Sequence, residues 1–203
     1  IQIHPKNSEY INEVTKLETA FINEFDTEKN NFIEKNIFRF LFDKLPNESY
    51  LFIGNSMPIR NIDNFVTTHP KKILTIGNRG ASGIDGVISS ALGMALLNTD
   101  SHNILIIGDV SFAHDLSALQ IAKQNDIPLT IIVINNSGGQ IFNKFPYAEF
   151  GIKDFEKFWI TNPELNIKKT ADLFGFEYLR IENLDEFEER TFKNQHIIEI
   201  VLA

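Results

Sequence analysis

The chain has 203 residues, 43% of them hydrophobic, which suits one domain or one domain with an appendage. Its formal net charge of −8 argues against a nucleic-acid surface, because such a surface needs a net or clustered positive charge. The absence of cysteine excludes disulfide and thiolate chemistry, and no apolar run approaches the ~20 residues that a membrane span requires. We therefore expect a cytoplasmic protein and, since the chain begins with Ile1 and not Met, a piece of a longer one.

The first 30 residues are polar and mixed in composition. We interpret residues 1–30 as a linker with short helical pieces, the remnant of a preceding domain. After them, Asn31 and Glu34 have the spacing of a helix-capping pair. Apolar residues then recur at helical spacing as far as Pro46, which predicts a helix over this stretch.

Six short apolar segments, rich in β-branched residues, occupy the remainder of the chain, and most are separated by amphipathic stretches of helical length. The segments are 50–54, 72–77, 103–109, 129–136, 177–181 and 196–202. Continuous apolar strands with helices between them indicate a parallel sheet that is covered on both faces. Because crossover connections are right-handed, we predict an α/β fold for residues 31–203, a doubly wound, mainly parallel six-stranded sheet with helices on both faces.

Polar, glycine-rich loops follow the first four predicted strands. They are GNSMPIR at 54–60, GNRGASGIDG at 77–86, GDVSF at 108–112 and NNSGGQIF at 135–142. In sheets of this kind ligands bind outside the carboxyl ends of the strands. We therefore expect the four loops to meet at one edge and to form a binding site.

Asp109 and Asn136, each placed directly after a buried strand, are candidate metal ligands. Mg²⁺ takes six oxygen ligands at about 2.0–2.1 Å, and a backbone carbonyl near Gly138 could supply a third protein oxygen. Ser111 and Phe112 are predicted to open the next helix, so that their N–H groups face a diphosphate. A single Asp or Asn after a strand is more often an ordinary turn residue, but this spacing and these flanks favour a cation and a diphosphate. The sequence does not distinguish Mg²⁺ from Mn²⁺.

The Gly-Asp-x-Ser motif at 108–111, followed by an Asn pair at 135–136, resembles the cofactor motif of thiamine diphosphate enzymes. Most members have Gly where this chain has Val110. Together with GGQIF and NRGASGIDG, that departure is similar to one branch, the 2-succinyl-5-enolpyruvyl-6-hydroxy-3-cyclohexene-1-carboxylate (SEPHCHC) synthases of menaquinone biosynthesis. The resemblance covers 31–203 and is densest over 50–142.

This resemblance implies a thiamine diphosphate-dependent transferase that also uses Mg²⁺ or Mn²⁺. Its members decarboxylate 2-oxoglutarate and add the product to isochorismate in a 1,4-addition. The chain resembles the diphosphate-binding domain alone. A pyrimidine-binding domain of the same enzyme, in a homodimer or homotetramer, carries the glutamate that activates the cofactor. We find no such glutamate here, so we assign no catalytic residue to this chain and expect it to be inactive alone.

The resemblance also implies substrate contacts in the first two loops. Arg60 and Arg79 match arginines that bind substrate carboxylates, for which a planar guanidinium is suited. Ser56 matches a substrate-contacting serine. An isolated Arg is more often part of a surface salt bridge, but these motifs favour a binding role.

The same resemblance implies cofactor and substrate contacts for several apolar residues. Ile84 matches the residue that props the cofactor into its bent form, and Gly108 belongs to the cofactor motif. Ile141 and Phe142 match residues that line the reaction chamber, although ordinary burial at the start of a helix is an equally good interpretation. We interpret His114, expected in the first turn of a helix, as structural.

Three other functions stay open at this point. One is a different thiamine diphosphate-dependent 2-oxo acid decarboxylase or synthase. The second is a nucleotide-binding dehydrogenase domain, although no Gly-x-Gly-x-x-Gly follows the first strand. The third is a non-catalytic fragment that binds a ligand.

Overall fold

The computed structural model describes residues 8–26, 32–66, 70–186, 192 and 194–202. Contacts divide the chain into two compact units, 1–31 and 32–203, which we describe separately. No helix in the described ranges is long and apolar enough to cross a membrane.

The described part of the first unit is one helix of 19 residues, α1 (Ser8–Asp26). One long helix therefore replaces the short helical pieces that we expected over this range, while the interpretation of 1–30 as a linker stays a prediction. Tyr10, Val14, Leu17 and Phe21 recur at intervals of four, three and four residues, which places them on one helical face, and all four are exposed.

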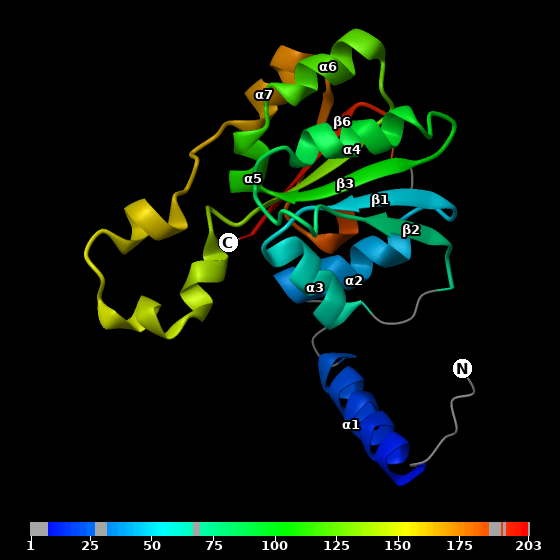
Figure 1. The fold of residues 1–203 in the computed structure, drawn as a ribbon, viewed down its shortest axis with the longest axis vertical. Helices are drawn as coiled ribbons and strands as arrows, with labels where there is room; N and C mark the ends of the chain where they lie inside the picture. Colours follow the sequence, from blue (N-terminus) through cyan, green and yellow to red (C-terminus); the bar gives the residue numbers. More distant parts are fainter. Residues whose placement is uncertain (1–7, 27–31, 67–69, 187–191, 193, 203) are drawn as a thin grey trace. The chain divides into compact units, whose positions relative to one another are not determined.

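The second unit is built on a six-stranded sheet in the order β2-β1-β3-β4-β6-β5 (Figure 1). The strands are β1 (Ser49–Ile53), β2 (Ile73–Ile76), β3 (Asn103–Gly108), β4 (Thr130–Asn135), β5 (Glu177–Ile181) and β6 (His196–Val201). Every neighbouring pair is parallel. The predicted doubly wound α/β fold is confirmed.

One helix of this unit precedes the first strand, and the others lie between strands. They are α2 (Glu34–Lys44), α3 (Met57–Phe65), α4 (Val87–Leu96), α5 (Asp109–His114), α6 (Ala118–Asn125) and α7 (Ile167–Phe174). The connection between β3 and β4 consists of two short helices, and His114 ends α5 instead of lying in a first turn.

The predicted cap of the first helix in this unit was wrong. The N-cap of α2 is Ile33, and no side chain caps the helix. Glu34 instead accepts a hydrogen bond from the Asn61 side chain, 27 positions away, at 2.8 Å. A tertiary contact has replaced the local one that the spacing suggested, and Asn31 lies outside the described residues.

Two apolar layers cover the sheet, one on each face. Successive side chains of a strand point to opposite faces, so Leu105 and Ile107 join one cluster while Ile104 and Ile106 join the other. Helices α4, α6 and α7 contribute to the first cluster and α2 to the second, and Figure 1 shows α4 and α2 on opposite sides of the sheet. This arrangement explains why β3 and β4 are buried along almost their whole length.

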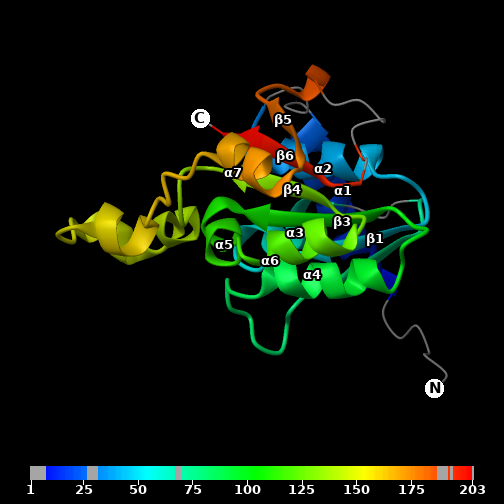
Figure 2. The ribbon, with the colours of Figure 1, turned by 90° about the horizontal axis from the view of Figure 1, so that it is seen from above.

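A long segment between β4 and α7 extends away from the sheet on the side where α5 lies (Figure 2). It contains three short helical turns, η1 (Gln140–Lys144), η2 (Pro146–Phe150) and the π-helical η3 (Glu156–Ile160). A further 3₁₀ turn, η4 (Leu184–Glu186), follows β5.

Candidate cofactor site

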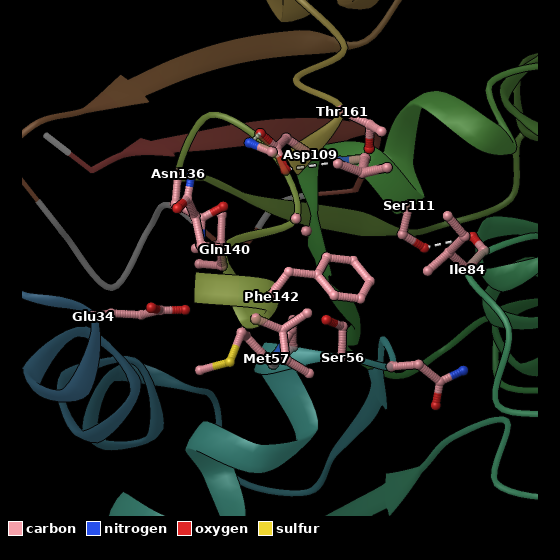
Figure 3. Close-up of a pocket in the computed structure, with 18 residues that line it drawn as sticks. Glu34, Ser56, Met57, Ile84, Asp109, Ser111, Asn136, Gln140, Phe142 and Thr161 are labelled. Carbon is pink, nitrogen blue, oxygen red and sulfur yellow. Dashed lines mark hydrogen bonds between the residues drawn. The ribbon is translucent and has the colours of Figure 1, made fainter. Parts of the chain in front are cut away.

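A pocket opens at the carboxyl ends of β1, β3 and β4 (Figure 3). It is lined by Glu34, Asn55, Ser56, Met57, Pro58, Ile84, Gly108, Asp109, Val110, Ser111, Ile134, Asn136, Gly138, Gly139, Gln140, Ile141, Phe142 and Thr161. All four predicted post-strand loops contribute to this set. Their meeting follows from the parallel sheet, whose strands all end at the same edge.

Asp109 is one of the most buried polar residues of the pocket, with 4% of its surface exposed. Its Oδ2 accepts a hydrogen bond from the Gly138 N–H at 2.7 Å, and its Oδ1 accepts one from the Val110 N–H at 2.8 Å. Burial raises the pKa of the Asp109 carboxyl above its usual value, while these N–H groups act in the opposite direction. The carboxylate is thus held in one orientation beside the loop that carries Asn136.

The loop after β4 depends on glycine. Gly138 has φ +119°, and a Cβ there would lie 2.5 Å from the Ile160 carbonyl oxygen. The Gly139 N–H donates to the same oxygen at 2.6 Å. These contacts fasten the end of η3 to the pocket and bring Thr161 into its wall. Only a residue without a side chain permits this close approach.

Ser111 joins the third loop to the second. Its hydroxyl donates to the Ile84 carbonyl at 2.6 Å, and both residues line the pocket. Gly108, with an extended backbone, is the N-cap of α5 and also lines it. The Phe112 side chain, in contrast, is fully buried in the first core cluster and does not line the pocket. Only the backbone of Phe112 could therefore contact a ligand in the pocket.

The two predicted arginines do not line the pocket. The Arg60 guanidinium donates to the Ser56 carbonyl at 2.7 Å, and that of Arg79 donates to Asn55 Oδ1 at 3.1 Å. Asn55 in turn donates to the Gly83 carbonyl at 2.7 Å. Each arginine is exposed and contacts a residue of the first loop that lines the pocket.

Ile141, Phe142 and Met57 give the pocket an apolar wall. The Phe142 ring meets that of Trp159 edge to face, with centroids 5.4 Å apart, and Trp159 lies 4.9 Å from Tyr147. Aromatic pairs in this arrangement stabilise one another beyond simple burial. The cluster holds the extended segment together next to the site.

Some residues at the pocket have strained backbone conformations. Ser56 and Thr161 line it with φ of 67° and 49°, and Ser137, beside Gly138, has φ 63°. Left-handed conformations cost a residue with a side chain of order 1–3 kcal/mol and persist where the surroundings impose them. Their presence here fits a site whose loops are held in place by tertiary contacts.

Four polar lining residues escaped prediction, namely Glu34, Asn55, Gln140 and Thr161. Asn55 and Gln140 lie within the post-strand loops, so their position was a usable signal. Thr161 comes from the end of η3 and Glu34 from the start of α2, and neither follows a strand.

The oxygen-rich end of the pocket suits a hard divalent cation with a phosphate. Asp109 offers a carboxylate, Asn136 an amide oxygen and Gly138 a backbone carbonyl, which are the ligand types that Mg²⁺ prefers. Among the described residues no group of three or more His, Cys, Asp or Glu could hold a metal ion. With one carboxylate at this end, a bound cation would keep positive charge for an anionic ligand.

A family model, "Thiamine pyrophosphate enzyme, C-terminal TPP binding domain", matches residues 57–195, more than half of the chain. The matched range contains Asp109, Asn136 and Gly138. Thiamine pyrophosphate is a synonym of thiamine diphosphate, so the match agrees with the resemblance read from the motifs.

Two similar relatives are both named 2-succinyl-5-enolpyruvyl-6-hydroxy-3-cyclohexene-1-carboxylate synthase. The protein of Staphylococcus epidermidis ATCC 12228 is 42% identical over 163 residues, which are 79% of this chain and 28% of the relative. That of Staphylococcus haemolyticus is 38% identical over 196 residues, 95% of this chain and 34% of the relative. The chain thus spans about a third of the length of these relatives, and the predicted resemblance is confirmed.

A solved structure, benzoylformate decarboxylase from Polynucleobacter necessarius, superimposes with a TM-score of 0.68 at 20% identity. The superposition covers 84% of this chain and 33% of that one. At this identity the match supports the fold alone.

Proposed function

Because this chain belongs to the family of thiamine pyrophosphate enzyme C-terminal TPP-binding domains, we propose that it forms the diphosphate- and metal-binding half of a SEPHCHC synthase site. The observation that carries the proposal is the hydrogen bond between Asp109 Oδ2 and the Gly138 N–H in a pocket shared with Asn136. It joins the two sequence motifs of the family in one place. The proposed location is the cytoplasm.

In the complete enzyme the reaction is decarboxylation of 2-oxoglutarate followed by 1,4-addition of the product to isochorismate, a transferase step of menaquinone biosynthesis. Thiamine diphosphate, when bound, supplies the electron sink that such a decarboxylation needs. The part of this chain is to hold the cofactor and to orient and shield the reacting groups.

Asp109, Asn136 and the Gly138 carbonyl are the proposed ligands of Mg²⁺ or Mn²⁺, and phosphate oxygens complete the coordination. The support is the donor set itself and the glycine cradle, which a Cβ at residue 138 would fill. Gly108, Ser111 and the backbone of Phe112, at the start of α5, are the proposed contacts of the diphosphate, and Gly108 and Ser111 line the same pocket.

The substrate end of the site is proposed to use Ser56, Arg60 and Arg79 for the carboxylates. Both arginines would have to turn from their present partners, the Ser56 carbonyl and Asn55, to reach the pocket. Long exposed side chains can do so, since such hydrogen bonds contribute little to stability. Ile84 would support the cofactor, and Ile141 with Phe142 would exclude water.

A pyrimidine-binding domain is the proposed partner, contributed by the same enzyme in a homodimer or homotetramer. It would supply the activating glutamate, so the chain alone should not decarboxylate 2-oxoglutarate. The relatives, about three times as long as this chain, have room for such a domain.

The test is substitution of Asp109 by Ala. The Mg²⁺-dependent affinity of the chain for thiamine diphosphate, measured by calorimetry, should fall by at least about tenfold, because charge-assisted contacts to a cation are strong. Asp100→Ala removes an exposed carboxylate and serves as the matched control. Circular dichroism should show both variants folded, and an unchanged cofactor affinity of Asp109→Ala would refute the metal assignment.

A further inference from the structure

We propose that Glu34 is a substrate-binding residue whose Oε2 accepts a hydrogen bond from the hydroxyl group of the acceptor substrate, isochorismate. This assignment rests on the proposed function and extends it to a residue outside the four post-strand loops. It concerns the acceptor alone and not the 2-oxo acid.

The position of Glu34 places its carboxylate inside the site. Glu34 is the first residue of α2, and its side chain lines the pocket together with Met57, Asn136 and Gln140. Figure 3 shows the carboxylate directed from α2 into the space between Met57 and Gln140. It enters from a different element than the proposed cofactor ligands do.

The carboxylate is held by a buried partner. The Asn61 side chain, on α3 and 1% exposed, donates to Glu34 Oε1 at 2.8 Å. Within the described part of the chain, Glu34 Oε2 has no hydrogen-bond partner. One oxygen is thus anchored while the other remains available, which is the arrangement of a preorganised ligand contact.

The surroundings of Glu34 perturb its carboxyl group. Glu34 is half-buried, and burial raises the pKa of its carboxyl, with the Asn61 hydrogen bond and the Lys144 charge acting in the opposite direction. Perturbed acids in clefts are therefore candidates for functional groups.

Of the two substrates, only the acceptor can donate a hydrogen bond to Glu34. An ionised carboxylate only accepts hydrogen bonds. The ionised 2-oxo dicarboxylate carries a ketone and two carboxylates, none of which can donate. Isochorismate carries a hydroxyl group, which can. Isochorismate also carries two carboxylates, which the Glu34 carboxylate would repel, so Glu34 would favour the orientation of the acceptor in which the hydroxyl group faces it.

The experiment uses the complete enzyme, the chain together with its pyrimidine-binding domain. Glu34→Ala should raise the KM for isochorismate at least about tenfold and change the KM for 2-oxoglutarate by less than about twofold, because a hydrogen bond to a charged group is lost. Calorimetric titration of isochorismate into the cofactor-loaded enzyme, without 2-oxoglutarate, should show the same loss of affinity. Glu34→Gln keeps the size of the side chain. With Asn61 donating to the amide oxygen, an N–H donor replaces the Oε2 acceptor, so this variant should show the same selectivity even if Glu34→Ala folds poorly.

Glu48→Gln is the matched control, since Glu48 is exposed at the opposite edge of the sheet and pairs only loosely with Lys72, at 3.5 Å. Its KM values should equal those of the wild type. Unchanged isochorismate affinity in both Glu34 variants, or an equal rise of both KM values, would overturn the assignment while leaving the proposed function intact. Absence of turnover by the wild-type enzyme would overturn both.

Discussion

The main chain at Gly138 approaches a neighbouring carbonyl group more closely than a residue with a side chain could. With φ +119° it passes within reach of the Ile160 carbonyl and still presents its N–H to Asp109. Backbone freedom, tertiary packing and the orientation of the proposed metal ligand therefore meet in one residue. A change as small as a methyl group disturbs all three.

Gly138→Ala should lower the free energy of unfolding by about 2 kcal/mol or more, because the strain of a positive φ adds to a Cβ contact that is too short. It should also abolish Mg²⁺-dependent binding of thiamine diphosphate. Urea denaturation and calorimetry measure the two effects.

Gly93→Ala provides the control for this substitution. Gly93 lies inside α4, and a Cβ there meets nothing within 4 Å. Removing a helical glycine should raise the free energy of unfolding by about 0.5–1 kcal/mol. Equal effects of the two substitutions would mean that the Gly138 turn does not constrain the site.

At the scale of elements, a side chain of β6 forms hydrogen bonds with both neighbouring strands, β4 and β5. Glu199 lies in the middle of β6, 5% exposed, where Asn135 of β4 donates to Oε1 at 2.6 Å and the Tyr178 hydroxyl of β5 donates to Oε2. Asn135 directly precedes Asn136, so this network also fixes the end of the strand that carries the proposed metal ligand. A buried carboxylate is tolerable here because both oxygens are paired.

Tyr178→Phe should lower the free energy of unfolding by about 1–3 kcal/mol at neutral pH, because Glu199 loses a donor and stays buried. Tyr10→Phe, at an exposed position of α1, should change little and is the control. Urea denaturation measures the free energy of unfolding of both variants. Equal free energies would show that the Tyr178 hydroxyl contributes nothing to stability.

The same contact has a pH dependence. Burial and the neighbouring Glu199 carboxylate raise the pKa of Tyr178 from 10.0 to about 12. The protonated hydroxyl is the stabilising form, so its contribution is complete below pH 10 and is lost as the pH rises through about 12. An alkaline absorbance titration of the folded protein should show one tyrosine ionising late, and Tyr178→Phe should remove that step.

At the scale of the whole molecule, both core clusters and every residue of the pocket belong to the second unit. A unit with its own core can fold alone. The proposed diphosphate domain, 31–203, begins within one residue of this unit.

A protein consisting of residues 32–203 should therefore keep the cofactor affinity of the full chain within about twofold and unfold in one cooperative transition. Calorimetric titration and thermal denaturation, each run beside the 203-residue chain, measure this. Loss of binding on removal of 1–31 would show that the first unit supports the site.

The fold was predictable because its signals are local. Six β-branched apolar runs predicted six strands within one residue of their observed ends. The absence of alternation predicted burial on both faces, which holds for the inner strands but not for the edge strands β2 and β5. In a parallel sheet the carboxyl ends share one edge, so Asp109 and Asn136 could be placed in one site from their positions alone. The sequence by itself determined the sheet, its loops and the family motifs.

Other features depended on contacts that no local pattern encodes. Glu34 has the spacing of a capping residue, yet Asn61 draws its carboxylate toward the pocket. Arg60 and Arg79 lie in the predicted loops, but their hydrogen bonds run to neighbouring loop atoms. Thr161 reaches the site because Gly139 binds the Ile160 carbonyl. Only the tertiary structure decided these placements, since a side chain with several possible partners takes the one that packing brings within hydrogen-bond distance.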